Sequence, residues 1–317
     1  MNLKSTVVAA LALFAGAPVV MATSFPGNPA DMYLLSDAAS EVYQYERTSP
    51  WAYVPGTYAG SAMPMVFSNS AQLGANSPYL GAAAGTNQDF FIGGFNGLTR
   101  IDANTGAFVS TIGAGVRVGP AAAPNGNIVV GGPGGIEEYN ANTGAFVRNV
   151  NSYGNGYNIF CFNGNNMFAT SWGGTTIKQY DFVTGLSSGP DIPVPFGAQK
   201  LAIGPDGALY SAALYESPTY EGVYRFNGSS WSLFADTQPQ SGGGPHAFAW
   251  DPISLDLFVS QNTGEIFRYN GITGAFLNHI DTVPTKLTDI LFKTTVPAPG
   301  AVSMLLLGGT VALRRRR

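Results

Sequence analysis

One short turn sequence recurs along this chain at nearly constant spacing. It reads Asn-Thr-Gly-Ala-Phe at 104–108 and again at 142–146, and degraded copies stand at 183–186, 226–229 and 272–276. The glycines of the five copies are 38, 41, 43 and 46 residues apart, at Gly106, Gly144, Gly185, Gly228 and Gly274. A supersecondary unit repeated at about 40 residues predicts a solenoid or a propeller.

Each repeat reads as four short strands in series. The unit at 197–236 predicts strands at 199–203, 208–212, 222–226 and 231–234, with a hairpin turn at Pro205-Asp206-Gly207. Strands of the other units are expected near Leu80, Phe91, Leu98 and Phe108, near Val118, Ile128, Ile136 and Phe146, near Ile159, Met167, Ile177 and Leu186, and near Phe248, Leu257, Ile266 and Phe276. Four strands in a meander form one propeller blade.

The first unit lacks a strand. Residues 32–35, 41–45 and 51–54 read as its second, third and fourth strands, while 286–292, after the last complete unit, has the pattern of a first strand. Pairing of these two ends would close a ring and remove the exposed sheet edges. The predicted fold is therefore all-β, a six-bladed β-propeller over 24–295. Seven blades are the alternative, if the connection at 55–76 hides a further unit, and helical segments are expected only in the two terminal regions.

Composition agrees with this fold class. Charged residues make up 11 % of the chain and 41 of its 317 residues are glycine, against about 25 % charged residues in an ordinary domain. Without Lys4 and the four terminal arginines, ten basic residues face 19 acidic ones, which argues against a nucleic-acid partner. Cys161 is the single cysteine, so no intrachain disulfide can form, and its apolar neighbours indicate a buried small hydrophobe.

The N-terminus reads as a targeting segment. Lys4 is followed by an almost wholly apolar stretch at 7–20, and Val20-Met21-Ala22 fits a cleavage site after Ala22. An alternative site is Ala15-Gly16-Ala17. This pattern predicts a secretory signal peptide at 1–22 and an exported protein.

The C-terminal segment 296–317 has three parts. It begins Val-Pro-Ala-Pro-Gly, continues with 13 uncharged residues at 301–313, and ends in four arginines. It resembles the PEP-CTERM sorting signal of Gram-negative bacteria, with Ala298 where that family has Glu, as in planctomycete-type variants. The residues that carry the resemblance are Pro297, Pro299, Gly300, Arg314, Arg315, Arg316 and Arg317. The resemblance implies export, transient membrane contact through 301–313 and processing by an exosortase-type protease; a plain membrane tail anchor is the alternative.

The repeats also resemble known propellers. The segments 202–207 and 245–252 are similar to the strand-and-turn patterns of NHL-like and YVTN-type propellers and, more distantly, of virginiamycin B lyase and the gluconolactonase group. Such motifs describe blades, and propellers host many unrelated functions.

Candidate catalytic residues are few. His246 is expected at the start of an innermost strand near one mouth of the channel, where it would be a weak candidate for a general base. Its Pro-His context resembles that of the streptogramin lyases, but we find no matching second His or Glu, so a structural role or a ligand contact is favoured. His279 is expected at the surface of an outermost strand.

Other polar residues do not form a recognisable catalytic or metal set. The sequence has no His-x-x-x-His, Cys cluster or calcium-loop pattern, so no metal or cofactor is expected. Glu137 and Glu138 are neighbours in a predicted strand and should point to opposite faces, which excludes a catalytic dyad. The expected first strands are mostly apolar, with these polar exceptions: Gln199, Lys200, His246, Lys286, Thr288 and Asp289.

These observations favour a non-enzymatic binding module at the cell surface or in the extracellular matrix. The expected partners are an exosortase-type protease and either exopolysaccharide or another surface protein. The exposed aromatic residues suited to binding are Tyr153, Tyr157, Trp172, Tyr215 and Tyr220. The alternative is a lyase or lactonase-type enzyme at the channel mouth near His246, which would require several titratable side chains to converge on one substrate.

Overall fold

The computed structural model describes residues 31–36, 41–45, 47–49, 52–53, 65–68, 81–85, 89–102, 108–152, 156–213, 221–238, 244–283 and 286–292. Within these ranges every regular element is a β-strand, and none of the ranges holds a helix with the length and hydropathy to cross a membrane. The predicted cleavage site at Ala22 and the predicted sorting signal at 296–317 lie outside the described residues.

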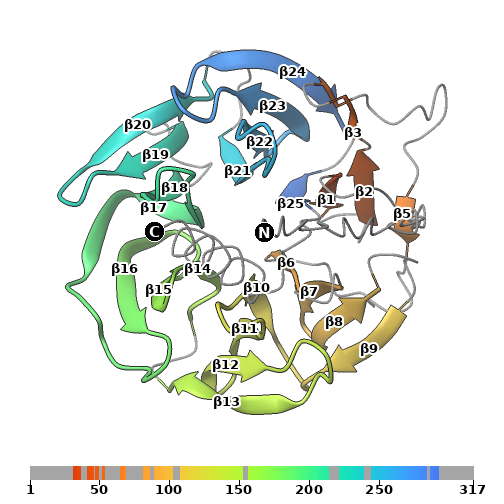
Figure 1. The fold of residues 1–317 in the computed structure, drawn as a ribbon, viewed down its shortest axis with the longest axis vertical. Helices are drawn as coiled ribbons and strands as arrows, with labels where there is room; N and C mark the ends of the chain where they lie inside the picture. Colours follow the sequence, from red (N-terminus) through yellow and green to blue (C-terminus); the bar gives the residue numbers. More distant parts are fainter. Residues whose placement is uncertain are drawn as a thin grey trace, which may run out of the picture.

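Three antiparallel sheets have the expected four strands in sequence order. They consist of β6 (Ala82–Ala84), β7 (Phe90–Gly94), β8 (Gly97–Ile101) and β9 (Phe108–Ile112); of β10 (Val118–Ala122), β11 (Ile128–Gly132), β12 (Gly135–Tyr139) and β13 (Phe146–Asn151); and of β21 (Pro245–Trp250), β22 (Leu257–Gln261), β23 (Glu265–Tyr269) and β24 (Phe276–Thr282). The sheets follow one another around a central axis, with the first strand of each sheet innermost and the last strand at the rim (Figure 1).

Two repeat units share one long strand. The sheet order is β14 (Ile159–Asn163), β15 (Asn166–Thr170), β16 (Gly174–Asp181), β17 (Ile192–Ile203), β18 (Leu209–Ala213), β19 (Gly222–Phe226) and β20 (Trp231–Asp236). The first part of β17 pairs with β16, Ile177 opposite Ile192, and its second part pairs with β18, Leu201 opposite Ser211. The predicted strand near Leu186 is wrong, because that residue lies in a turn, and Pro190, which has no N–H to donate, precedes β17.

The C-terminal strand closes the ring, as predicted. β25 (Leu287–Phe292) pairs with β1 (Met32–Ser36), Met32 opposite Phe292, and the sheet continues through β2 (Glu41–Tyr45) to β5 (Met65–Ser68). The predicted fourth strand at 51–54 is wrong. β4 (Ala52–Tyr53) pairs only with β3 (Arg47–Ser49) in a separate hairpin, and β5, within the connection at 55–76, takes the outer position. The short run before Pro55 cannot extend into a full ladder, because proline lacks the N–H that pairing requires.

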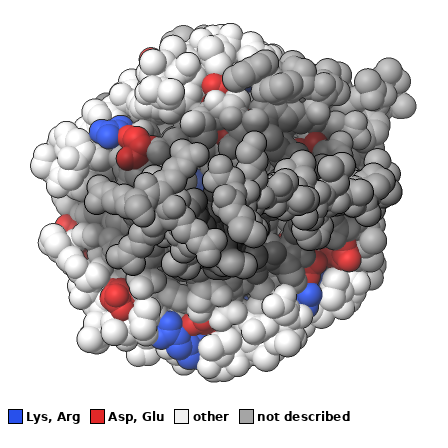
Figure 2. Space-filling model, in the orientation of Figure 1, with Lys and Arg blue, Asp and Glu red and all other residues white. Residues whose placement is uncertain are grey.

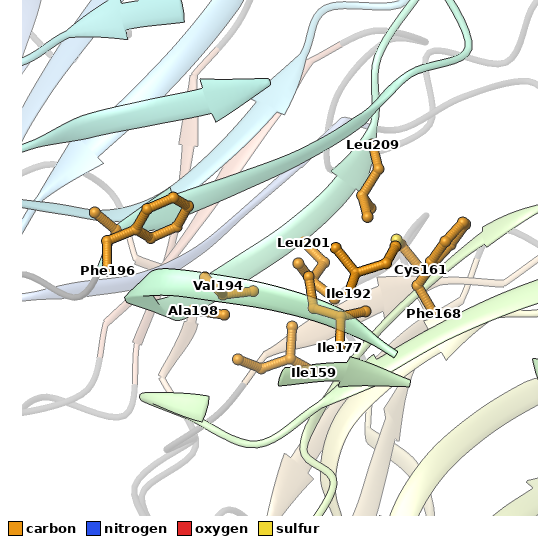
Figure 3. Packing of buried hydrophobic residues seen from close by; sticks show 11 residues of the cluster. Ile159, Cys161, Phe168, Ile177, Ile192, Val194, Phe196, Ala198, Leu201 and Leu209 are labelled. Carbon is orange, nitrogen blue, oxygen red and sulfur yellow. The ribbon is translucent and has the colours of Figure 1, made fainter. Parts of the chain in front are cut away.

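Apolar side chains pack between neighbouring repeat units, including the two units that share the seven-stranded sheet. Figure 3 shows one such cluster, in which Ile159 and Ile177 from one unit meet Ile192 and Leu201 of β17. Cys161 lies in the same cluster, where burial raises the pKa of its thiol. The cysteine is therefore a small core hydrophobe, as its sequence context predicted.

The recurrent turn has the same hydrogen bonds at each described copy that retains the Thr-Gly pair. Asn140 Oδ1 accepts from the backbone N–H of Thr143 at 2.9 Å, and the following Gly144 has a φ of +72°. The corresponding bonds run from Thr184 to Asp181 at 2.8 Å and from Thr273 to Asn270 at 2.9 Å. The turn requires a positive φ at the residue after the threonine, and glycine adopts this conformation without steric cost. The copy at 104–107 lies outside the described residues.

A polar pair between the second and third strands also repeats. Ion pairs occupy this position in three units, and amide hydrogen bonds occupy it in two: Asp89–Arg100, Asp206–Arg225 and Asp256–Arg268, then Asn127–Glu138 and Asn166–Gln179. Many charges are thus already paired, and on the described part of the face in Figure 2 the charged side chains are scattered without a field of one sign.

Candidate functional site

The starts of the first strands converge on a small axial cavity. Its volume is about 30 Å³, enough for roughly two water molecules, since one needs about 10–15 Å³. Each first strand, or the residue just before it, contributes to the lining, which includes Gly81, Gly119, Asn158, Gln199, His246 and Thr288. A cavity of this size admits water but no substrate.

An ion pair lies beside this axial cavity. Lys200 Nζ is 2.7 Å from both carboxylate oxygens of Asp289, whose residue is 0 % exposed. Asp289 also accepts from the backbone N–H of Ala82 at 2.7 Å, so it links β25 to β17 and to the start of β6. A carboxylate without partners at such depth would be strongly unfavourable, so the contacts with Lys200 and with two backbone N–H groups compensate for its burial.

His246 lies at the start of β21 and is 3 % exposed. Its Nε2 is 3.3 Å from the Gln199 amide nitrogen, and Gln199 in turn accepts from the Trp172 indole N–H at 2.5 Å. Burial, with the positive charges of Lys286 and Lys200, lowers the imidazole pKa to about 3, although a backbone hydrogen bond at Leu287 opposes this shift. The ring is therefore neutral at pH 7, and it is a far weaker base than an imidazole with a pKa near neutrality.

A larger cavity adjoins the axial one, and we call it the mouth pocket. It has a volume of about 330 Å³, and its lining is Val116, Val118, Gly131, Gly132, Pro133, Gly156, Tyr157 and Asn158. Asn158 lines both cavities, and its side-chain oxygen accepts from the backbone N–H of Trp172 at 2.6 Å. The Trp172 side chain is 41 % exposed beside this junction.

Two glycines in the lining of the mouth pocket leave no room for a side chain at their positions. A Cβ on Gly131 would lie 1.9 Å from the Tyr157 carbonyl oxygen, and a Cβ on Gly132 would lie 2.6 Å from the Glu137 carboxylate. Any side chain there would displace the strand or the wall. The paired glycines Gly131 and Gly132 therefore maintain this cavity.

The carboxylate of Glu137, next to the mouth pocket, is paired with a cationic side chain. Glu137 lies 2.7 Å from Arg117 Nε and accepts from the Tyr139 hydroxyl at 2.7 Å, and both charged side chains are nearly buried. Glu138 instead pairs with Arg148 at 2.7 Å. The two glutamates have separate partners and opposite directions, as predicted, so they cannot act together on one substrate.

The structure gathers most of the predicted polar residues into one region. Gln199, Lys200, His246 and Thr288 line the axial cavity, Asp289 pairs with Lys200, and Lys286 carries charge near the imidazole. Sequence reasoning missed Asn158 and the mouth pocket, for which the paired glycines before β12 were the available signal.

The remaining predicted residues fall elsewhere. His279 is exposed on β24, as predicted, whereas Tyr157, which lines the mouth pocket, is half-buried and not exposed as expected. Tyr153, Tyr215 and Tyr220 lie outside the described residues. In the described part of the chain, no group of three His, Cys, Asp or Glu side chains is placed to hold a metal ion.

Comparison with known proteins shows the fold. The chain is similar to a chain of the crystal structure of a nidogen/laminin complex, with a TM-score of 0.62 and 12 % identity, covering 84 % of this chain and 99 % of that one. It is also similar to a protein of unknown function from Bacteroides caccae, with a TM-score of 0.57 and 12 % identity, covering 83 % of this chain and 98 % of that one. No protein-family model and no curated protein matches the sequence. The chain is thus an all-β protein with a β-propeller-like fold, built of four-stranded antiparallel sheets and closed by pairing of its C-terminal strand with its N-terminal one.

Proposed function

We propose that this protein is a non-enzymatic binding module, exported to the cell surface or extracellular matrix, with the mouth pocket as its ligand site. One observation carries this proposal. The mouth pocket, about 330 Å³, has no titratable side chain except Tyr157 in its described lining, while the imidazole and the axial ion pair surround about 30 Å³. Small-molecule sites occupy about 300–1,000 Å³, so at the channel mouth the space for a ligand is separate from the groups that could move protons. Two other hollows, of about 500 and 490 Å³, are also of ligand size, but their carboxylates are already paired, Glu138 with Arg148 and Asp191 with Lys178.

We infer six blades for the propeller. The sheet that starts at β10, the sheet that starts at β21 and the sheet that starts at β6 would each be one blade. The seven-stranded sheet would be two blades that share β17, and the sheet closed by β25 would be the sixth. The connection at 55–76, where a seventh unit could have been hidden, contributes β5 to the first blade.

The two terminal segments support the proposed location. Cleavage after Ala22 would release an exported chain, and 296–317 would mediate transient membrane contact and processing by an exosortase-type protease. The order of Pro297, Pro299, the uncharged run and the arginines supports this proposal. Mass spectrometry of the protein recovered from the cell surface tests it, because an intact Arg317 terminus there would favour a plain tail anchor.

The chemistry of the mouth pocket favours a neutral ligand. Its lining includes Tyr157, whose ring packs edge-on against Tyr180, an amide at Asn158 and aliphatic surface at Val116, and the exposed Trp172 ring lies beside it. An aromatic face with an adjacent amide suits a saccharide, so the proposed partner is exopolysaccharide, with a surface protein as the other candidate. A nucleic acid is not expected, because the described lining has no cationic side chain.

Binding is tested with defined sugars. Titration calorimetry with neutral gluco-oligosaccharides and with acidic alginate oligomers should detect the neutral ligand. Tyr157→Ala should weaken binding at least roughly tenfold, as expected for a central aromatic contact. Leu233→Ala, at a side chain 48 % exposed on the rim strand β20, is the matched control. Equal binding by both variants would move the site away from the mouth pocket.

Absence of turnover is tested separately. Lactone and cyclic-ester substrates should not react with the parent protein, with or without divalent metal. Turnover that His246→Ala lowers by about 100-fold or more would replace the proposal with the lyase or lactonase alternative.

A further inference from the structure

One cluster of exposed apolar side chains is built from two adjoining turns of the sheet β21–β24. We call it the apolar turn patch and define it as Ile253, Leu255 and Ile272, which are 58 %, 41 % and 76 % exposed. The turns abut, since a Cβ on Gly271 would lie 1.6 Å from the Leu255 carbonyl oxygen. Three large aliphatic side chains thus project into solvent from neighbouring positions.

Leu255 occupies a position where the related turns have glycine. The turn Asp251–Asp256 repeats the bonds of the turn at Asn270: the Leu255 N–H donates to the Asp251 carbonyl at 2.9 Å, as the Gly274 N–H does to the Asn270 carbonyl at 2.8 Å. Leu255 has a φ of +61°, beside +73° for Gly274. A leucine in this left-handed conformation is strained, because its Cβ comes too close to the following carbonyl oxygen. An exposed leucine kept at the cost of strain indicates a role outside folding.

The described chain ends beside β22, the strand that follows the first turn of this patch. Phe292, the last described residue, packs against Phe258 with ring centroids 5.5 Å apart, and Phe258 follows Leu255 by three residues in sequence. Residues 293–300 then lead to the uncharged run at 301–313. Eight extended residues span at most about 28 Å, so the run begins within that distance of Phe292.

The length of the uncharged run limits how far the propeller could stand from a bilayer. As a helix, its 13 residues would be about 20 Å long at 1.5 Å per residue, against a hydrocarbon core of about 30 Å. With the arginines held at the far interface, part of the linker at 293–300 would be drawn into the near leaflet. The end of β25 would then be held against the lipid headgroups.

We propose that the apolar turn patch docks onto the lipid surface into which the C-terminal segment inserts. Its acidic residues do not oppose this contact, because Asp251 and Asp256 are buried, at 0 % and 7 % exposed. The patch can therefore enter the interfacial layer without desolvating a carboxylate that is now in water. Aliphatic side chains without exposed acids suit the boundary between headgroups and acyl chains. The inference rests on the membrane contact proposed above for 301–313.

The chain itself allows a site-specific test. Cys161 is its only cysteine and is buried with a raised thiol pKa, so an introduced cysteine can be labelled selectively. An environment-sensitive dye is placed at Ile272→Cys in the full chain, which is reconstituted in phosphatidylethanolamine–phosphatidylglycerol vesicles containing nitroxide lipid. Phe95→Cys is the control, because Phe95 is 45 % exposed in the turn between β7 and β8, which is not part of the patch. Leu306→Cys reports on the tail.

We expect quenching at positions 272 and 306, at least roughly threefold stronger at 272 than at 95, as for a side chain in the interface. Quenching at 306 without quenching at 272 would overturn the docking but leave the membrane contact of the tail intact. Lack of quenching at 306 would refute that proposed contact itself, and the docking with it. A dye at 272 that is already shielded before vesicles are added would show that the patch is covered by the tail or, if shielding depends on concentration, by a second copy, and would also overturn the inference.

A second variant separates docking from folding. Leu255→Gly removes both the strain and an inserted side chain. It should raise the urea midpoint of unfolding while it lowers quenching at 272 by roughly half or more, the trade-off expected where a residue serves function at the expense of stability. Undiminished quenching in this variant would contradict a role of Leu255 in docking.

Discussion

The turns between third and fourth strands and the starts of the first strands differ in how strictly they repeat. In three different sheets, Asn140, Asp181 and Asn270 make the same bond to a threonine N–H, at 2.8–2.9 Å. The first strands instead bring a different side chain to the axis in each unit, such as Gln199 and His246. A repeated element with constant chemistry is part of the frame, whereas variation on that frame is where a specific site can be built.

Ring closure should have the largest effect, because it joins both regions. A chain ending after Val283 loses β25, and with it the partner of β1 and the carboxylate of Asp289. The exposed sheet edge should cause aggregation or rapid proteolysis. A chain ending after Thr295 keeps the strand and is the control. If the shorter chain is as soluble and protease-resistant as the longer one, the closure has no energetic importance.

The axial ion pair should matter far more than one at the rim. Asp289→Ala leaves Lys200 without its partner and two backbone donors without an acceptor, so unfolding in urea should show a loss of about 3–5 kcal/mol. Asp191→Ala removes the partner of Lys178 at an exposed site, with side chains 53 % and 38 % exposed, and should leave the midpoint near that of the parent. Similar losses of unfolding free energy in both variants would show that the axial ion pair matters no more than the exposed one.

The buried imidazole should make stability depend on pH. The pKa of His246 is about 3 in the folded protein, below about 6.5 in an unfolded chain. The unfolded state therefore takes up a proton first as pH falls, so stability present above pH 6.5 is lost between about pH 6.5 and 3. At pH 5 the loss is about 2 kcal/mol relative to pH 7.

His246→Gln keeps a polar group next to Gln199 but does not titrate, so it should lack this part of the pH dependence. Urea titrations of parent and variant at pH 7 and pH 5 measure the difference, and the carboxylates common to both proteins cancel. Parallel pH profiles would mean that the imidazole is protonated as easily in the folded state as in water.

The turns should show the smallest effects, and equal ones. Asn140→Ala and Asn270→Ala each remove an oxygen that accepts two backbone N–H groups, at 2.9–3.0 Å. Each should cost about 1 kcal/mol, and the double variant should cost their sum because the turns are far apart. Markedly unequal losses of stability in thermal or urea unfolding would show that turns with the same hydrogen bonds contribute differently to stability.

Several elements were predictable because their causes are local. The residue after an Asn-x-x-Thr turn has a positive φ, so it must be glycine or a strained substitute, and the turn at 142–146 is therefore visible in the sequence. The regular spacing of its copies then predicts repeating four-stranded units. The pattern of 286–292 likewise indicated a first strand without a partner, and the structure pairs it with β1. The alternation of neighbouring side chains in a strand also predicts that Glu137 and Glu138 point to opposite faces.

Other features depend on contacts that no local pattern encodes. Whether the outer strand of the first sheet is 51–54 or 65–68 depends on which segment reaches β2 across a long connection, and the structure selects Met65–Ser68. Whether one strand serves two units depends on the path between sheets, which makes β17 continuous. Hydrophobic runs of similar strength compete for such positions, and only packing against the rest of the ring distinguishes them.

The sequence by itself determined the repeat, the turn chemistry, the closing strand and the polar exceptions among the first strands, because each follows from backbone geometry within a few residues. The tertiary structure decided that those exceptions surround a cavity too small for a substrate, that His246 is neutral, and that an uncharged pocket lies beside it. Burial and cavity volume arise from residues brought together by the ring, some more than 200 positions apart in the chain, as when Asp289 accepts from the N–H of Ala82. Local sequence patterns do not encode such distances, so the chemistry of the site became visible only when the ring was closed.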